Sequence, residues 1–363
     1  MRLGVEAALI DGVLLTGDVD VVDGRVANVG LASPNGRGVA VPGFVDLQVN
    51  GFGGVDFLET DSEGYRRAGT ALLETGVTAY LPTFITSTEE QLLAAMREVP
   101  RDRERPRILG IHLEGPFLSP SRLGTHGAEA RLDPDVALLD RLLDAGPVRL
   151  MTLAPELPGA DAVIDRLIAR GVAVSLGHSD ATAEQANAAF DRGVHSVTHI
   201  FNAMRPFRHR DPGIVGAALA RDDVIVCVIL DGIHLSPETA AVVWRAARER
   251  VALVTDAITA AGRADGSYSF GTLDIQVHDG AVRGPEGVLA GSVLTMIEAV
   301  RALRALGATL EEAVRAATAV PASVIGTDAV GRLGVGTPAD LVVLDDRLDI
   351  ARVLVAGEVR VAV

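Results

Sequence analysis

Short apolar runs recur through the middle of the chain and alternate with amphipathic stretches rich in Ala, Leu, Arg and Glu. A buried strand followed by an amphipathic helix is the repeating unit of a parallel barrel. The pattern therefore predicts an α/β fold, a (β/α)8 TIM-like barrel. Its eight strands are expected over residues 44–48, 77–82, 108–113, 148–153, 172–177, 196–199, 225–230 and 252–255. Helices over 292–306 and 310–319 complete the outer ring.

The two ends of the chain have a different pattern, with short valine-rich strands between Gly and Asp-Gly turns. We expect residues 1–42 and 331–363 to pair into one small β-sandwich domain, with residues 43–330 inserted as the barrel. One segment near 266–285 breaks the βα alternation, because it has the period-two pattern of a hairpin. It contains Tyr268 and Phe270, and a structural role is expected for it.

Composition narrows the class of protein. The chain is 48% hydrophobic but only 4% aromatic, so its core is built from small aliphatic side chains. A formal net charge of -15 argues against nucleic-acid and membrane-surface partners, which are polyanionic. The single cysteine, Cys227, lies in the apolar run VIVCVIL and is expected to be a core thiol. No signal-peptide pattern or membrane-length apolar stretch is found, and a cytoplasmic location is expected.

The sequence contains no lysine, so all basic side chains other than histidine are arginine. Schiff-base chemistry, a phosphate-binding P-loop and a carboxylated-lysine metal bridge each require an amine that this chain lacks. These three chemistries are therefore excluded.

Polar residues of the metal-ligand type stand where successive apolar strands stop. They are Glu114 after ILGIHL, His178 after VAVSLG, His199 after SVT and Asp256 after VALVT. In a parallel barrel the carboxyl ends of the strands share one rim, and that rim carries the active site. Any one of these residues alone is more simply explained as a hydrogen-bonded strand end. Together they predict a catalytic rim.

One carboxylate and two imidazoles form a natural ligand set for one divalent metal ion, with a position left open for water. We expect Glu114, His178 and His199 to bind Zn2+, while the same set also accepts Fe2+, Mn2+ or Co2+. Asp256 could accept a proton from the activated water and deliver it to a leaving amine.

Other polar residues leave alternatives open. His112, two positions before Glu114, could support a metal ligand or serve packing, whereas His195 is expected to be structural and His278 solvated. The segment RPFRHRDPG, residues 205–213, is either an exposed basic loop or a binding site for an anion such as phosphate. His234, at the next strand end, could join Arg210 around the same anion.

Seven motifs resemble the N-acetylglucosamine-6-phosphate deacetylase family of the amidohydrolase superfamily. In chain order they are PGFVDLQVNGFGGVDF, GIHLEGPFLSPSRLGTHG, LGHSDAT, THIFNAM, DGIHL, VTDAI and LAGS. The resemblance implies a metal-dependent hydrolase that removes the acetyl group from an amino-sugar phosphate in amino-sugar catabolism and cell-wall sugar recycling. It also implies a homodimer.

Site roles follow from the resemblance by motif position. It implies the same metal ligands and Asp256 as general base and acid, and it adds His126 as the group that polarises the acetyl carbonyl. The residues that it implies for substrate binding are Thr125, His126, Asn202, Ala203, Arg210, His234, Leu289, Ala290 and Gly291. In relatives the arginine can come from a neighbouring subunit.

The first barrel strand departs from the wider superfamily, in which a His-x-His pair commonly binds a second metal ion. This chain has Gln48 and Asn50 at those positions. Neutral amides are weak zinc ligands, so a site with a single metal ion is expected. Two alternatives remain: an amidohydrolase for another N-acylated amine, and a catalytically silent phosphosugar sensor.

Overall fold

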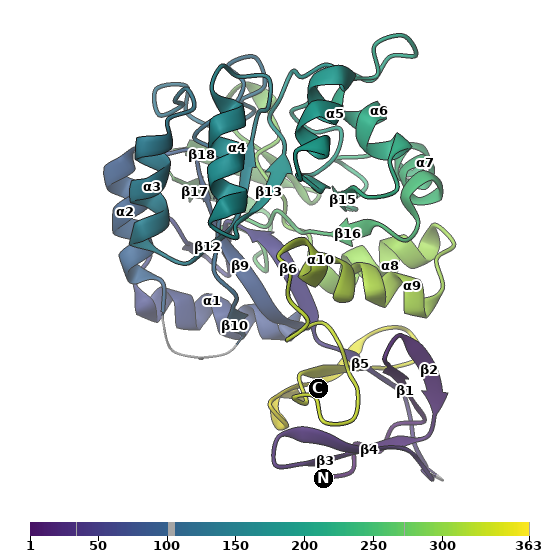
Figure 1. The fold of residues 1–363 in the computed structure, drawn as a ribbon. Helices are drawn as coiled ribbons and strands as arrows, with labels where there is room; N and C mark the ends of the chain where they lie inside the picture. Colours follow the sequence, from purple (N-terminus) through teal and green to yellow (C-terminus); the bar gives the residue numbers. More distant parts are fainter. Residues whose placement is uncertain (34, 101–105, 272, 363) are drawn as a thin grey trace.

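The computed structural model describes residues 1–33, 35–100, 106–271 and 273–362. Its larger part is a barrel of parallel strands, which confirms the predicted fold class (Figure 1). The barrel strands are β6 (Phe44–Val49), β9 (Val77–Ile85), β11 (Ile111–Glu114), β12 (Val148–Leu153), β13 (Ala173–Leu176), β14 (Ser196–Val197), β15 (Ile225–Val228) and β16 (Val251–Leu253). A short strand, β10 (Arg107–Ile108), pairs beside β9.

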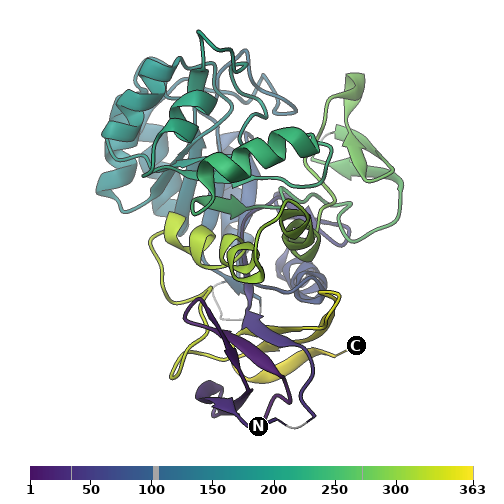
Figure 2. The ribbon, with the colours of Figure 1, turned by 90° about the vertical axis from the view of Figure 1, so that its right-hand side faces the viewer.

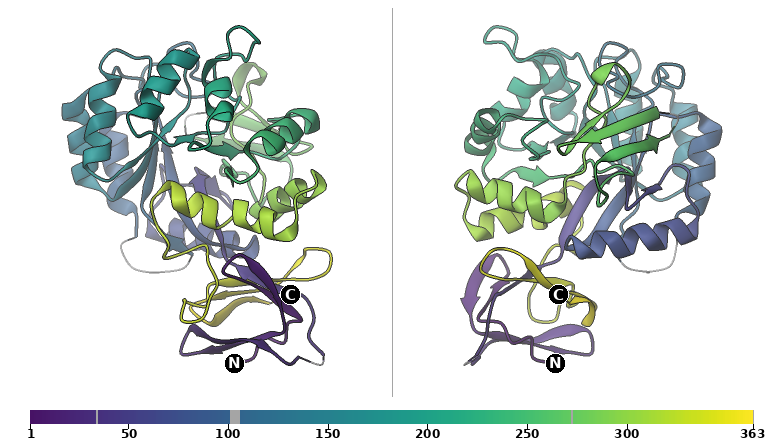
Figure 3. Two further views of the ribbon diagram at one scale, coloured as in Figure 1. Left: turned by 45° about the vertical axis from the view of Figure 1, so that its right-hand side comes forward. Right: turned by 180° about the vertical axis from the view of Figure 1, so that it is seen from behind.

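Helices surround this barrel on its outer face (Figures 1 and 3). They are α1 (Ser62–Glu74), α2 (Glu89–Glu98), α3 (Val136–Ala145), α4 (Ala160–Ala169), α5 (Ala183–Asp191), α6 (Gly213–Ala220), α7 (Pro237–Ala247), α8 (Met296–Ala305), α9 (Leu310–Ala316) and α10 (Ala319–Val324). Capping boxes at Thr88, Thr182, Thr295 and Thr309 satisfy the first backbone N–H groups of four of them. Within the described ranges, no helix combines the length and the apolar character needed to cross a bilayer.

Both chain ends meet in one six-stranded sheet below the barrel (Figures 1 and 2). Its strands, in spatial order, are β2 (Val13–Thr16), β1 (Ala7–Ile10), β5 (Val39–Pro42), β20 (Leu341–Leu344), β21 (Ile350–Val355) and β22 (Glu358–Ala362). A hairpin of β3 (Asp18–Val22) and β4 (Arg25–Leu31) packs Val19, Val21 and Val26 into the same apolar cluster as Leu341. A separate β-rich domain formed by both termini is therefore present.

The segment that interrupts the barrel forms three strands, one more than the predicted hairpin. They are β17 (Gly266–Phe270), β18 (Leu273–His278) and β19 (Ala281–Arg283), and they pair antiparallel. Residue 272 of this segment lies outside the described residues. The small sheet leans over one side of the barrel in the rear view of Figure 3 and buries Phe270, Ile275 and Val282 in its own cluster.

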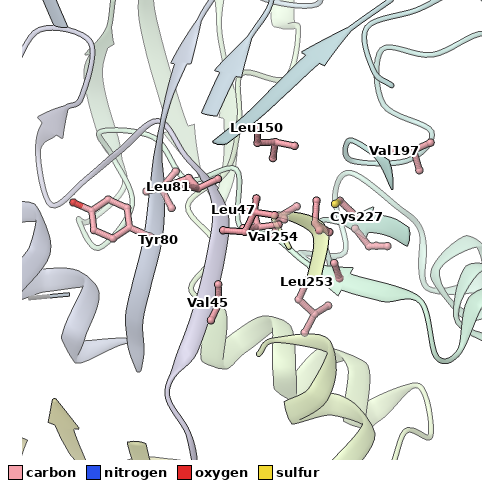
Figure 4. Packing of buried hydrophobic residues seen from close by; sticks show 14 of the residues in the cluster. Val45, Leu47, Tyr80, Leu81, Leu150, Val197, Cys227, Leu253 and Val254 are labelled. Carbon is pink, nitrogen blue, oxygen red and sulfur yellow. The ribbon is translucent and has the colours of Figure 1, made fainter. Parts of the chain in front are cut away.

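The lower interior of the barrel is apolar. Leu81, Leu150, Cys227 and Leu253 are buried in one cluster, and Figure 4 shows them between the strands. The cysteine is free and buried, as a core thiol should be. Because side chains along a strand alternate between the two faces of the sheet, inward positions further along the same strands lie in the next layer of the interior.

That next layer is polar and hydrogen-bonded from strand to strand. Thr83 Oγ1 lies 3.3 Å from His112 Nδ1, and His112 Nε2 lies 2.8 Å from Thr152 Oγ1. Thr152 Oγ1 lies 2.7 Å from Thr198 Oγ1, which donates to Ser175 Oγ at 2.7 Å. All five side chains are buried. His112 thus takes part in a network rather than in apolar packing alone.

The barrel closes between its last and first strands through Asp46. One carboxylate oxygen accepts hydrogen bonds from the backbone N–H groups of Gln48 and Thr255, at 3.2 and 3.3 Å. The other accepts the Thr255 hydroxyl at 2.6 Å. A single bridge between Val49 and Ala257 accompanies these bonds. Asp46 therefore fixes the residue that precedes Asp256.

Replacing Asp46 by Ala should lower the free energy of unfolding by about 2 to 5 kcal/mol, because three buried donors lose their acceptor. Urea unfolding of the metal-free protein measures this loss. Asp46→Asn keeps an acceptor and the shape of the side chain, so it should lose less. Equal losses in the two variants would contradict the role of the acceptor.

The same pair of proteins gives a pH test. Burial raises the pKa of Asp46 to about 7, so the folded state holds a proton that the unfolded state has released. Stability from this group is then lost as the pH rises through that value. The wild-type advantage over Asp46→Asn should shrink between about pH 4 and about pH 7 and stay level above that.

Candidate active site

Three residues at the upper strand ends have left-handed backbone conformations. The φ angles are +48° at His178, +24° at His199 and +50° at Asp256. Such values are uncommon for residues other than glycine and often mark functional sites. Neighbouring backbone bonds hold the turns, including Ser119 N–H to His178 O at 2.9 Å and Ser292 N–H to Asp256 O at 2.9 Å. Each turn ends its strand at the predicted rim.

The structure brings Glu114, His178 and His199 into one buried cluster. His199 Nε2 lies 2.9 Å from Glu114 Oε1, and His178 Nε2 lies 3.2 Å from the same oxygen. The two Nε2 atoms are 3.2 Å apart. Three potential ligand atoms therefore face one point in space.

Electrostatics keep this cluster charged. Burial opposes ionisation of Glu114, but hydrogen bonds from His178 and His199 outweigh it and hold the pKa of the carboxyl well below its ordinary value. Burial also opposes protonation of His199, yet its bond to Glu114 and the charge of that carboxylate leave the pKa raised. The carboxylate is thus available as an anionic ligand.

The donor set fits a divalent cation. Two imidazole nitrogens at 3.2 Å cannot both present lone pairs to each other without a proton or a cation between them. A carboxylate with two imidazoles supplies the charge and donor types that zinc and its neighbours in the first transition row prefer. His178 Nδ1 bonds to the carbonyl of Arg122 at 2.9 Å, which leaves Nε2 as the ligand atom.

Asp256 lies beside this cluster and is held by two amides. Asn50 Nδ2 donates to Asp256 Oδ1 at 2.7 Å. Gln48 Nε2 donates to the same oxygen at 3.1 Å and to Glu114 Oε1 at 3.0 Å. Burial and the negative charge of Glu114 raise the pKa of Asp256 to about 6. A carboxyl group whose pKa lies near neutral pH can both accept and release a proton, as a general base and acid must.

His126 faces the cluster from a loop. Its Nε2 lies 3.8 Å from Glu114 Oε2, and its ring centre lies 4.4 Å from that of His178. Burial, together with the neighbouring His178, lowers the pKa of His126 to about 3. The ring is therefore neutral and acts as a hydrogen-bond partner.

These groups open into a cavity of about 240 Å³. Asn50, Glu114, His126, His178, His199 and Asp256 line it, together with the expected substrate-binding residues Thr125, Asn202, Ala203, His234, Leu289 and Gly291. Ala290 is instead buried in the apolar cluster of the inserted sheet. Phe270 of that sheet also lines the cavity, so the segment expected to be structural contributes one side chain to the cavity wall.

The structure does not bring Arg210 to its own chain's cavity. Arg210 is exposed on the loop before α6, and among the described residues the cavity wall does not include it. His234 does reach the wall, and its Nδ1 lies 2.6 Å from Asp231 Oδ2. His195 contacts the backbone carbonyls of Gly193 and Val324, and His278 is exposed on the inserted sheet.

Sequence reasoning missed several residues that shape the site. Thr86 contacts His126, Arg122 orients His178, and Phe270 covers the cavity. Thr86 follows β9 directly, so the rule that strand ends meet at one rim could have identified it. The sequence offers no comparable signal for a backbone carbonyl or for an inserted sheet.

Comparisons with known proteins agree with this architecture. The amidohydrolase family profile matches residues 39–360. The chain is 39% identical over 343 residues to N-acetylglucosamine-6-phosphate deacetylase from Rattus norvegicus, which covers 89% of this chain and 83% of that protein. It is 36% identical over 325 residues to N-acetylgalactosamine-6-phosphate deacetylase from Escherichia coli O157:H7, covering 87% and 86%.

A solved structure is similar along its whole length. It is a substitution variant of N-acetyl-D-glucosamine-6-phosphate deacetylase from Mycobacterium smegmatis in complex with N-acetyl-D-glucosamine-6-phosphate. The two chains are 37% identical with a TM-score of 0.95, and the match covers 100% of this chain and 99% of the other.

The cluster predicts a measurable metal site. After chelation, the wild type should take up about one Zn2+ per chain, and saturating metal at about 100 times Kd should add about 2.7 kcal/mol to its stability. Glu114→Gln and His199→Asn should lose both effects. His195→Asn is the matched control, because that imidazole contacts only backbone carbonyls away from the cluster.

Elemental analysis after gel filtration and thermal melts with and without metal measure the outcome. Wild-type uptake in the variants would show that the cation binds elsewhere.

Proposed function

The chain belongs to the amidohydrolase family, and on that premise we propose that it hydrolyses the N-acetyl group of N-acetylglucosamine 6-phosphate. The products are glucosamine 6-phosphate and acetate, and the reaction belongs to amino-sugar metabolism. One observation carries the proposal: Glu114, His178 and His199 meet beside Asp256 and His126 in a single cavity. The relatives named above support the choice of substrate.

We assign Glu114, His178 and His199 to one divalent cation, with Zn2+ as the first expectation. When bound, such a cation acidifies water and polarises the acyl oxygen. His126 is assigned to the acyl oxygen, where charge develops as water adds to the carbonyl carbon. Because the ring is neutral, it stabilises that charge by a hydrogen bond rather than by an ion pair.

Asp256 is assigned as general base and then general acid. Its carboxylate takes a proton from the attacking water and gives it to the sugar nitrogen as the C–N bond breaks. Gln48 and Asn50 donate to one of its oxygens, which leaves the other free for this proton. Atoms balance, since one water molecule supplies the hydroxyl of acetate and the hydrogen of the amine.

The sugar phosphate is assigned to the part of the cavity wall that includes His234. We assign the polar contacts with it to the lining residues Asn202, Ala203 and His234, and the contacts with the sugar to Thr125, Leu289 and Gly291. A phosphate dianion in an acidic protein also needs a cation nearby. Arg210 is the expected cation, although it is exposed in its own chain.

We therefore assign Arg210 to the cavity of a second copy in a homodimer. Residues 206–210 are all exposed, and the exposed fraction of Phe207 among them is 52%. An apolar ring beside arginines is a common anchor at protein interfaces. This arrangement would complete each site with one residue from the partner.

An acetate-release assay with defined metal after chelation tests the proposed function. N-acetylglucosamine 6-phosphate should be the best substrate, and the galactosamine epimer measures how strictly the sugar is read. N-acetylglucosamine without phosphate and an N-acetyl amino acid should turn over far more slowly. Equal rates on these would favour a broader amidohydrolase. Absence of both metal uptake and acetate release would favour a metal-free phosphosugar sensor.

Asp256→Asn tests the assignment of the proton carrier in the same assay. It should retain the metal ion but lose about 100- to 10,000-fold in kcat, because the proton carrier is removed. In the wild type, kcat/KM should fall on the acid side as Asp256 becomes protonated, since the base must be ionised. A near-normal rate for Asp256→Asn would overturn the assignment.

The proposed sharing of Arg210 has its own test. Arg210→Ala should raise KM for the phosphorylated substrate at least about tenfold with little change in kcat. Arg332→Ala, in the terminal domain, is the control. When Arg210→Ala and Asp256→Asn chains are mixed by refolding or coexpression, one site of each mixed dimer regains both residues. Activity at low substrate should then recover, and no recovery would place Arg210 within its own subunit's site.

A further inference from the structure

Two imidazoles of the site differ in the backbone group that contacts Nδ1: an acceptor at His178 and a donor at His126. His178 Nδ1 lies 2.9 Å from the carbonyl oxygen of Arg122, which can only accept a hydrogen bond. In a neutral His178 ring the hydrogen therefore lies on Nδ1, which leaves the lone pair of Nε2 for a cation in place of the hydrogen bond to Glu114. This is the arrangement of a metal ligand.

His126 has the reverse arrangement. Its Nδ1 lies 3.3 Å from the backbone nitrogen of Thr86, whose N–H group can only donate. The Thr86 hydroxyl lies 2.9 Å from the same Nδ1. A hydrogen on Nδ1 would point at the Thr86 N–H group, so Nδ1 carries the lone pair. The hydrogen of the neutral ring is then on Nε2, the atom on the side of Glu114.

We propose that Thr86 is a positioning residue that fixes His126 as the Nε2–H tautomer, which makes this ring a hydrogen-bond donor into the cavity. The inference rests on the proposed function for its catalytic meaning, but the tautomer itself does not depend on it. A ring with hydrogen on Nε2 cannot use that nitrogen as a metal ligand. Thr86 thereby separates the role of His126 from that of His178, 4.4 Å away.

Thr86 is itself held firmly. It follows β9 and is 4% exposed. Its hydroxyl carries one hydrogen and has two acceptors within reach, His126 Nδ1 at 2.9 Å and the carbonyl oxygen of Glu114 at 3.2 Å, so the backbone N–H of Thr86 is the donor that belongs to His126 alone. The capping box of α2 begins two residues later at Thr88. Gly115 leaves space for the hydroxyl, because a Cβ atom at that position would lie 2.1 Å from Thr86 Oγ1. The end of β9, the end of β11 and the His126 loop therefore meet at this one side chain.

The tautomer can be observed directly in the metal-loaded protein labelled with ¹⁵N-histidine. The His126 signals, assigned by their absence in His126→Asn, should show an unprotonated Nδ1 and a protonated Nε2 without any substrate present. A protonated Nδ1 in the wild type would overturn the proposal. This measurement remains valid even if the sugar phosphate proves not to be the substrate.

Substitution then tests Thr86. Thr86→Val keeps the shape and the backbone N–H group but removes the hydroxyl that lies 2.9 Å from Nδ1, so the Nδ1 signal should shift and kcat should fall about tenfold. KM and metal content should stay unchanged. Thr86→Ser keeps the hydroxyl and should restore both the spectrum and kcat, which a purely structural role would not require.

The outcomes separate the two hypotheses. An unchanged spectrum and rate in Thr86→Val would overturn the role of Thr86. A protein with the expected tautomer but no acetate release from any acylated sugar phosphate would overturn the proposed function alone.

Discussion

The buried carboxylate of Glu114 is the constraint on which the site depends. Its side chain is only 3% exposed, and an ionised carboxylate without partners would be very costly at that depth. The partners come from three other strand ends: His178 after β13, His199 after β14 and Gln48 on β6. Placing this one charge thus requires the strand ends to converge, and a barrel achieves this by closing the sheet.

The polar layer beneath the site follows from the same constraint. His112 lies two residues before Glu114 on β11, and hydrogen bonds join it to Thr152 of β12 and, through Thr152, to Thr198 after β14. Hydroxyl and imidazole groups can each accept and donate, so the chain is satisfied without a net charge. Burial lowers the pKa of His112 to about 4, which keeps this layer neutral below the charged one. The network links the strands that carry the proposed ligands from side chain to side chain.

Three features could be predicted from the sequence: the barrel, the β domain that both chain termini form together, and the four polar residues at the rim. All three depend on periodicity and on where strands stop. The sequence did not allow prediction of the details that depend on backbone turns. The strand expected over 196–199 ends at Val197, since His199 turns into a left-handed conformation. The helix expected over 310–319 divides into α9 and α10 at Thr318, whose hydroxyl bonds back to Val314 O. Such turns are decided by tertiary contacts that no local pattern records.

The neutral amides Gln48 and Asn50 are consistent with the charge balance between the two carboxylates of the site and one divalent cation. With neutral imidazoles, Glu114 and Asp256 carry two negative charges in a region of low dielectric, and one divalent cation neutralises them. A second divalent cation would leave two positive charges uncompensated by the described side chains of the cluster. Amides at these positions instead give N–H donors to the carboxylates. Asn50 Oδ1 has no partner among the described residues, so it also leaves an acceptor at the cavity wall, where a histidine ligand would leave none. The amide pair therefore donates hydrogen bonds to both carboxylates without adding charge, and both amides use the same oxygen of Asp256.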